Sequence, residues 1–324
     1  MSFYIGAYGI SPSATQWNPD LESAFIEGLK ALPFVRGLEL PHYAAALDRW
    51  DEDFLFAHAD PAWDYVVTTL PALFGALREH PRFGLASTDD AGREAALAGI
   101  EATRASVRRT HDRLGRRAIR AVEVHSGPSR GWLDGTGSTE RFADSLARIA
   151  SADWDGAQIV VEHCDAAVAG QPHEKGFLRI ADEIAAIATA NARGHRIGAS
   201  INWGRSGIEL RGGERVHEHV HALAEAGVLR GLIFSGCSGA DTPYGAWKDT
   251  HMPPVRERYV PAGADGSLLT EQAMIDALRA AGNADLAFLG VKIAARPVDA
   301  SVPQRLELLR SALTLLAAAR LSLA

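Results

Sequence analysis

Short apolar segments alternate with longer amphipathic segments along most of the chain. Eight segments rich in Val, Ile, Leu and Phe have the length and composition of buried strands; they cover residues 3–7, 37–40, 65–70, 119–124, 158–162, 198–202, 231–234 and 287–293. Seven others have the apolar spacing of helices, at residues 21–31, 93–114, 141–149, 176–192, 214–226, 271–281 and 303–321. Strand followed by helix, repeated, predicts a parallel sheet covered by helices.

Eight such repeats without a break in composition predict a closed (β/α)8 TIM barrel formed by residues 1–324 as a single domain. The alternative is an open, doubly wound sheet. The turn after the first predicted strand, Gly6-Ala7-Tyr8-Gly9-Ile10, lacks the G-x-G-x-x-G pattern of a dinucleotide site. The closed barrel is therefore the favoured architecture.

Polar residues gather where the predicted strands end. Barrel enzymes build their active sites at the carboxyl ends of the strands. The side chains at these ends, in chain order, are Glu39, Thr69, His125, Glu162, His163, Asp165, Asn202, Trp203, Arg205, Ser235, Ser238 and Lys292. The opposite ends begin with ordinary turn residues such as Arg36, Asp155, Arg196 and Arg230. This asymmetry predicts a functional site in the barrel mouth. For any one of these side chains, the alternative is a hydrogen bond or ion pair that only orders the mouth.

Three short motifs on these strands resemble the xylose isomerase-like superfamily of sugar isomerases and epimerases. They are Gly37-Leu38-Glu39-Leu40, His125-Ser126-Gly127 and Val160-Val161-Glu162-His163. The resemblance follows the strand pattern over nearly the whole chain. It implies isomerisation or epimerisation of a sugar, usually with a divalent metal held by Glu on strand five, Asp and His on strand six, His on strand seven and Glu on strand eight.

Only Glu162 matches that ligand set. The other ligand positions hold Asn202 and Arg205 on strand six, Ser235 on strand seven and Lys292 on strand eight. A hard divalent ion needs several oxygen or imidazole ligands, and two cationic side chains repel it. We therefore expect no metal and no other cofactor, with the Lys292 ammonium taking the ion's place opposite Glu162. The alternative is a divalent Mn, Mg or Zn ion.

Isomerisation through an enediol requires a base next to the carbonyl and an electrophile that holds the developing oxyanion. Glu162 is the candidate base, and Lys292 or Arg205 is the candidate electrophile. His125 is a candidate proton relay, because an unperturbed imidazole titrates near neutrality. The alternative is an inert ion pair between Glu162 and Lys292 in a barrel without activity.

The remaining candidates fit a small, anionic carbohydrate such as a sugar acid, a sugar phosphate or a sulfo-sugar. Arg205 and Lys248 are the expected partners of its anionic group. Segment 244–253 combines two aromatic residues with Lys, Asp and His and is a candidate lid; the alternative is an anchored surface loop. The predicted substrate-binding residues are Glu39, His163, Asn202, Trp203, Arg205, Ser235, Lys248 and His251, and for Trp203 a packing role is the alternative.

Two further patterns carry weaker predictions. The run His217-Glu218-His219-Val220-His221 contains the H-E-x-x-H zincin signature. It lies in a predicted outer helix, so we expect solvated or weakly metal-binding histidines there. Cys164 and Cys237 are expected to be packed thiols, since two cysteines make no disulfide framework and suit a reducing cytoplasm.

The composition of the chain argues against two classes of binding partner, nucleic acids and membranes. A formal net charge of -7 lacks the basic excess of a nucleic-acid binder, and no apolar run is long enough to span a bilayer. We expect a cytoplasmic enzyme and, by analogy with related barrels, a homodimer or homotetramer. Two alternatives stay open. One is a non-catalytic sugar-binding barrel, and the other is a metal-dependent hydrolase or lyase that uses Glu162, His163, Asp165, Asp249 and His251.

Overall fold

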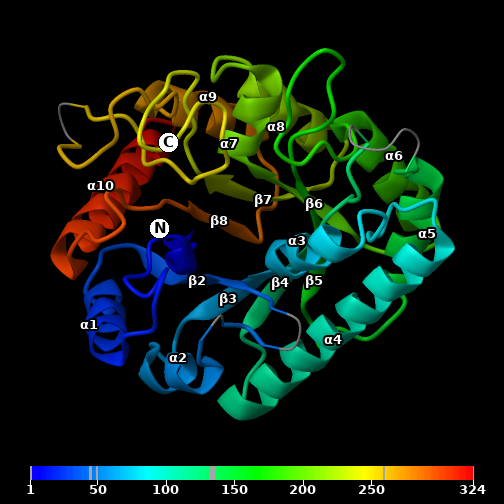
Figure 1. The fold of residues 1–324 in the computed structure, drawn as a ribbon, viewed down its shortest axis with the longest axis horizontal. Coiled ribbons are helices and arrows are strands. Elements are labelled where there is room, and N and C mark those ends of the chain that lie inside the picture. The colour runs from blue at the N-terminus through cyan, green and yellow to red at the C-terminus, as the bar shows by residue number, and fades with distance from the viewer. Residues whose placement is uncertain (1, 44–45, 49, 131–135, 258–259, 324) are drawn as a thin grey trace.

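Eight parallel strands close into a barrel in which each strand pairs with its neighbour in the chain and β1 pairs with β8 (Figure 1). The computed structural model describes residues 2–43, 46–48, 50–130, 136–257 and 260–323. The strands are β1 (Phe3–Ile5), β2 (Val35–Pro41), β3 (Asp64–Thr68), β4 (Ile119–Val124), β5 (Gln158–His163), β6 (Gly198–Asn202), β7 (Leu229–Phe234) and β8 (Phe288–Val291). The predicted (β/α)8 barrel is confirmed.

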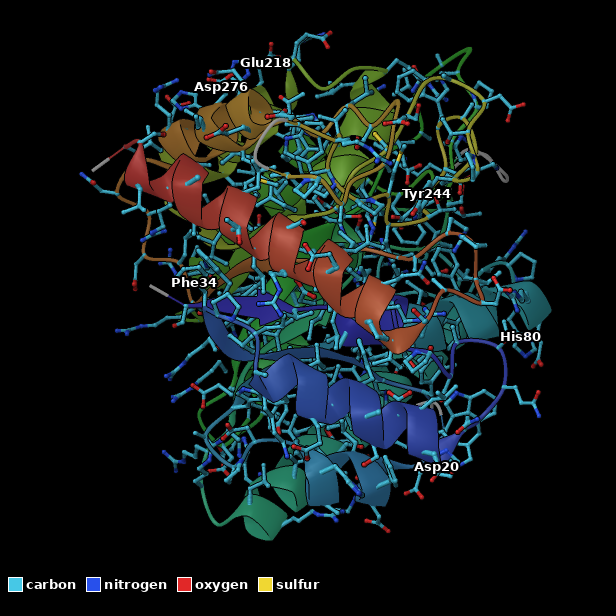
Figure 2. All side chains as sticks on the ribbon, turned by 90° about the vertical axis from the view of Figure 1, so that its left-hand side faces the viewer. Asp20, Phe34, His80, Glu218, Tyr244 and Asp276 are labelled. Carbon is cyan, nitrogen blue, oxygen red and sulfur yellow. The ribbon has the colours of Figure 1, made fainter. Side chains whose placement is uncertain are left out.

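Helices surround the barrel (Figure 1). They are the short 3-10 helix η1 (Ala7–Gly9) and the α-helices α1 (Pro19–Lys30), α2 (Glu52–His58), α3 (Leu70–Glu79), α4 (Asp90–Leu114), α5 (Thr139–Ala150), α6 (Ile180–Asn191), α7 (Trp203–Leu210), α8 (Val216–Glu225), α9 (Glu271–Ala281) and α10 (Val302–Leu321). Helix α10 contacts both α1 and α9, and Figure 2 shows it crossing the molecule between them. No helix among the described residues is long and apolar enough to span a membrane.

Each predicted strand overlaps an observed one, whereas three helices were not predicted. Helix α3 begins at Leu70, which the apolar pattern assigned to the preceding strand. Helix α2 is a short segment of seven residues. Helix α7 follows β6 without a loop, and its glycines Gly204 and Gly207 lower its intrinsic helix propensity. The burial of Trp203 and Ile208 shows that tertiary packing stabilises α7.

The inside of the barrel is built in layers. The lower layer is an apolar cluster of Tyr4, Val66, Ala121, Val160, Ile233 and Phe288. Side chains on one face of a strand recur every second residue, so the next layer holds Thr68, Glu123, Glu162 and Ser235. These four side chains are buried and polar. The strands thus place a polar mouth directly on an apolar floor.

Candidate active site

Glu162 lies at the centre of the mouth, where three side chains contact its carboxylate. Arg205 Nη1 is 2.5 Å from Oε1, His125 Nε2 donates to Oε2 at 2.7 Å, and Thr68 Oγ1 donates to Oε2 at 3.4 Å. Burial alone would raise the pKa of Glu162, but Arg205 and Lys292 hold that pKa well below its ordinary value. Glu162 is therefore an ionised carboxylate in a nearly dry site.

His125 is the neutral partner of this carboxylate. Its side chain is buried, and burial lowers the pKa of the imidazole despite the neighbouring Glu162. The second ring nitrogen, Nδ1, lies 3.3 Å from Thr69 Oγ1. Because Nε2 carries the proton that points at Glu162, the uncharged ring accepts a proton at Nδ1.

Lys292 does not pair with Glu162 as predicted, because its ammonium donates to Glu39 Oε1 at 2.5 Å. Tyr8 stands beside both groups: its ring lies 5.1 Å from Nζ, and its hydroxyl donates to Glu39 at 3.2 Å. Burial alone would lower the pKa of Lys292, but Glu39 and other nearby anionic groups raise it well above its ordinary value. A Cβ at Gly6 would lie 2.6 Å from the Lys292 side chain, so this close approach requires glycine.

Glu123 is a third buried carboxyl group of the mouth, and the sequence interpretation missed it. It accepts a hydrogen bond from Ser200 Oγ at 2.8 Å. Burial, with the nearby charges of Glu162 and Glu39, raises the pKa of Glu123 well above its ordinary value. This shift favours the neutral, proton-donating form of Glu123. A signal existed in the sequence, since Glu123 is the one charged residue in the apolar run 121–124.

The donor set of the mouth does not fit the divalent metal that the resemblance implies. Oxygen atoms of Glu39, Glu123 and Glu162 lie within 4.8 Å of one another. The Lys292 ammonium already contacts Glu39, however, and the Arg205 guanidinium contacts Glu162. Two fixed positive charges among three carboxyl groups repel a divalent cation.

Several polar atoms of the mouth have no hydrogen-bond partner within the described part of the chain. They are Oε2 of Glu39, Oε2 of Glu123 and both side-chain amide atoms of Asn202. Buried polar groups are nearly always paired in folded proteins. A cluster of such exceptions is typical of a binding site for a polar ligand.

The segment after β7 covers the mouth. Asp249 accepts from Arg205 Nε at 3.0 Å and is also bonded to Lys175. His251 Nδ1 lies 3.3 Å from Asp249 and 3.1 Å from Ser235 Oγ. Burial alone would raise the pKa of Asp249, but Lys175 and Arg205 hold it well below its ordinary value. Asp249 thus fills a buried cationic site with a carboxylate of the protein itself.

Lys248, predicted to bind the substrate, points away from this site. It pairs with Glu174 at 2.7 Å near the surface. Trp247 and His251 both have left-handed backbone conformations, with φ of 55° and 56°. Such conformations are uncommon for these residue types and concentrate in functional loops. Lys175, which sequence analysis did not single out, takes the position expected for Lys248.

Two other predicted substrate-binding residues lie outside the mouth. His163 follows Glu162 on β5 and therefore points to the opposite side of the sheet, where it contacts Glu183 and Glu209 of the helical layer. Trp203 is fully buried, and a Cβ at Gly213 would lie 2.8 Å from its ring. Trp203 packs in the core, which was the alternative to its predicted substrate-binding role.

A cavity of about 120 Å³ adjoins the mouth at β1 and β2. Tyr8 and Glu39, which both contact Lys292, form part of its wall with Trp17, Tyr43 and Trp50. A larger cavity of about 790 Å³ lies at the amino-terminal ends of β5, β6 and β7 and contains none of the mouth residues. In Figure 2 Phe34, just before β2, lies on the left of the molecule, and Tyr244, of the segment after β7, lies right of its centre.

A family model described as domain of unknown function DUF4862 matches residues 4–308. A Salmonella typhimurium LT2 protein described as uncharacterized protein STM3670 is 32% identical over 317 residues, which are 97% of this chain and 96% of that relative. Among solved structures, D-psicose 3-epimerase from Clostridium cellulolyticum H10 with D-tagatose has a TM-score of 0.56 at 14% identity and covers 99% of both chains.

Three more solved structures have the same fold. The IolI protein with a bound zinc atom has a TM-score of 0.59 at 11% identity and covers 98% of this chain and 99% of its own. D-allulose 3-epimerase from a Methylomonas species has a TM-score of 0.56 at 13% identity, with 98% and 96% covered. A xylose isomerase domain protein from Alicyclobacillus acidocaldarius is also similar. The resemblance to xylose isomerase-like barrels is confirmed for the fold.

Proposed function

The chain belongs to the DUF4862 family, and we propose that it is a carbohydrate isomerase or epimerase that moves a proton next to a carbonyl group without a metal in its barrel mouth. The observation that carries this proposal is the pairing of two proton acceptors with two proton donors in one buried site. Glu162 is ionised and His125 is neutral, whereas Lys292 and Glu123 each carry a proton. The epimerases among the solved structures of this fold agree with it.

In the proposed reaction, Glu162 takes the proton from the carbon next to the carbonyl. The π electrons of the carbonyl move to its oxygen, and the Lys292 ammonium and the Glu123 acid face the charge that develops there. In an isomerase, a proton then adds to the former carbonyl carbon, while the hydroxyl proton of the carbon that Glu162 deprotonated passes to the former carbonyl oxygen and a new carbonyl forms. In an epimerase, the proton returns to the other face of the same carbon and the original carbonyl re-forms. His125, 2.7 Å from Glu162, relays the proton between these positions.

An anionic group on the substrate explains how Glu162 becomes basic enough to act. Arg205 contacts Glu162 and Asp249 at the same time and weakens Glu162 as a base. When the lid opens, Asp249 leaves Arg205 and Lys175, and a carboxylate, phosphate or sulfonate takes its place. A substrate anion that draws Arg205 away from Glu162 raises the basicity of that carboxylate. The aromatic wall of the adjoining cavity suits the apolar face of a sugar ring.

The experiment that tests this function is solvent exchange. The metal-stripped protein is incubated in D2O with sugar acids, sugar phosphates or sulfo-sugars, with and without EDTA, and the carbon next to the carbonyl is followed by NMR. We expect deuterium at that carbon, no effect of EDTA and loss of exchange in Glu162→Gln. Glu307→Gln, the same change on the exposed face of α10, is the matched control. Exchange that requires an added metal, or that survives in Glu162→Gln, contradicts the proposal.

The cytoplasmic location and the homo-oligomeric state are parts of the same proposal. Both cysteines are buried and unpaired, and burial raises the pKa of Cys237 to about 12, which is compatible with a reducing compartment. Sedimentation of the purified protein tests the expected dimer or tetramer.

A further inference from the structure

A second cluster of titratable side chains lies outside the barrel, behind the end of β5. His163 of β5 and Glu183 of α6 are buried there, and Glu209 of α7 and His219 of α8 are nearly so. The proposed reaction uses none of them, because the wall of the barrel separates them from the mouth. This cluster is therefore independent of the proposed function.

Three of these residues aim ligand atoms at one another. His163 Nε2 lies 3.1 Å from Glu209 Oε2, and His219 Nε2 lies 3.8 Å from Glu209 Oε1. The ligand atoms of all three residues lie within 4.8 Å of one another. In a tetrahedral zinc site with bonds of about 2.0–2.2 Å, neighbouring ligand atoms are about 3.3 Å apart. The observed spacings need only small side-chain adjustments to reach that geometry.

Further hydrogen bonds fix the orientation of both imidazole rings. Glu183 Oε2 lies 2.7 Å from His163 Nδ1, and Ser206 Oγ lies 3.1 Å from His219 Nδ1. Both contacts leave the Nε2 atoms directed toward Glu209. Metal-bound histidines characteristically hold a carboxylate or another polar group at the second ring nitrogen. The cluster thus has the outer hydrogen bonds of a metal site as well as its ligands.

We propose that His163, Glu209 and His219 bind one divalent transition-metal ion of the zinc type between β5, α7 and α8. Two imidazoles and one carboxylate suit zinc, whereas magnesium and calcium prefer oxygen ligands. No Lys or Arg side chain contacts these three residues among the contacts that the structure describes, in contrast to the carboxylates of the mouth. His163 itself, held between two carboxylates, must release its Nε2 proton when the ion binds. The Glu209 side chain is about 10% exposed, so an ion has access from outside.

The ligands of this site differ from those of the H-E-x-x-H signature in the same helix. The signature pairs His217 with His221, and both are exposed. Figure 2 shows Glu218 at the outer edge of the molecule. His219 is the histidine of this run that turns inward. The motif therefore indicated the right helix but the wrong pair of side chains.

The test is zinc titration of the untagged, full-length protein after EDTA treatment and desalting. Calorimetry and elemental analysis measure the stoichiometry, and thermal melting measures stabilisation. We expect one equivalent of zinc and a higher Tm. His219→Ala and Glu209→Gln lose stoichiometric binding, and Glu183→Gln weakens it by about 10- to 100-fold. His217→Ala and His221→Ala, on the exposed face of the same helix, bind zinc as the unmodified chain does.

Three outcomes overturn the proposal. The first is absence of stoichiometric zinc binding, as expected if His163 only forms buried ion pairs with the two carboxylates. The second is unchanged binding in His219→Ala. The third is loss of binding in His221→Ala, which would place the ion on the surface. To separate loss of zinc binding from loss of folding, His219→Gln is melted in EDTA beside His219→Ala. A normal Tm in EDTA without a zinc-dependent rise supports the site.

Discussion

Glu162 and His163 are adjacent on β5, yet they belong to opposite electrostatic environments. On the inner side of the strand, Arg205 and Lys292 surround the Glu162 carboxylate with positive charge. On the outer side, Glu183 and Glu209 surround the His163 imidazole with negative charge. A single residue step along the strand therefore separates a carboxylate held by cations from an imidazole held by carboxylates. The comparison teaches that two adjacent residues of one strand can face opposite charge environments, because alternation sends their side chains to opposite sides of the sheet.

The largest expected effect is that of Glu162→Gln. Removal of the base lowers the rate of solvent exchange by about 10²- to 10⁴-fold, the usual contribution of a positioned acid or base. Deuterium incorporation by NMR gives the rate, and far-UV circular dichroism shows that the variant is folded. A rate within twofold of the unmodified protein would remove Glu162 from the reaction.

The second effect concerns the Lys292 to Glu39 pair. Lys292→Met leaves the buried Glu39 carboxylate without its cation and lowers the free energy of unfolding by about 3–5 kcal/mol. The double variant Lys292→Met, Glu39→Gln recovers most of that loss, because no uncompensated charge remains. Urea unfolding measures both. Equal stability of the single and double variants would show that the pair does not act as a unit.

Sequence patterns predicted the positions of the strands better than they predicted which side chains of the mouth contact one another. A barrel strand is buried on both faces and therefore appears in the sequence as a nearly continuous apolar run, which can be recognised without knowledge of the fold. The choice of Glu39 over Glu162 as the partner of Lys292 depends on closure of the barrel between β1 and β8, which joins opposite ends of the chain. The spacing of residues along the sequence does not reveal this pairing.

Side-chain direction was the second source of error. His163 follows the strand end as Glu162 does, but alternation sends it outward. Lys248 was chosen for its position in a polar loop, and the fold brings Lys175 from a distant loop to Asp249 instead. Glu123 was overlooked because a single Glu in an apolar run looks like an ordinary strand end. Its raised pKa follows from burial and from the nearby charges of Glu162 and Glu39, which only the folded barrel brings together.

The third prediction tests the outer side of β5 by pH. Burial alone would lower the pKa of His163, but Glu183 and Glu209 raise it to about 10 from 6.5. A raised pKa contributes stability that is complete below pH 6.5 and is lost as the pH rises toward about 10. In EDTA, the free energy of unfolding of the unmodified chain therefore falls more steeply over this range than that of His163→Gln. Parallel curves from urea titrations would contradict the assignment.

The smallest effect is expected at the lid. Asp249→Asn removes the negative charge that competes with a substrate anion for Arg205 and Lys175. Affinity for inorganic phosphate, or for the sugar acid that shows exchange, should rise about tenfold, a change of about 1.4 kcal/mol. Isothermal titration measures it, with the exposed Asp241→Asn of the same loop as the control. An unchanged Kd would mean that Asp249 does not occupy the anion site.

Zinc-edge anomalous diffraction from a crystal soaked in zinc tests the contrast between the two sides of β5 most directly. The predicted map has one strong anomalous peak, bonded to His163 Nε2, Glu209 and His219 Nε2, and none beside Glu162. A peak coordinated by Glu162 with Glu39 or Glu123 would contradict the account, because it would show that Lys292 and Arg205 do not keep a divalent ion out of the mouth.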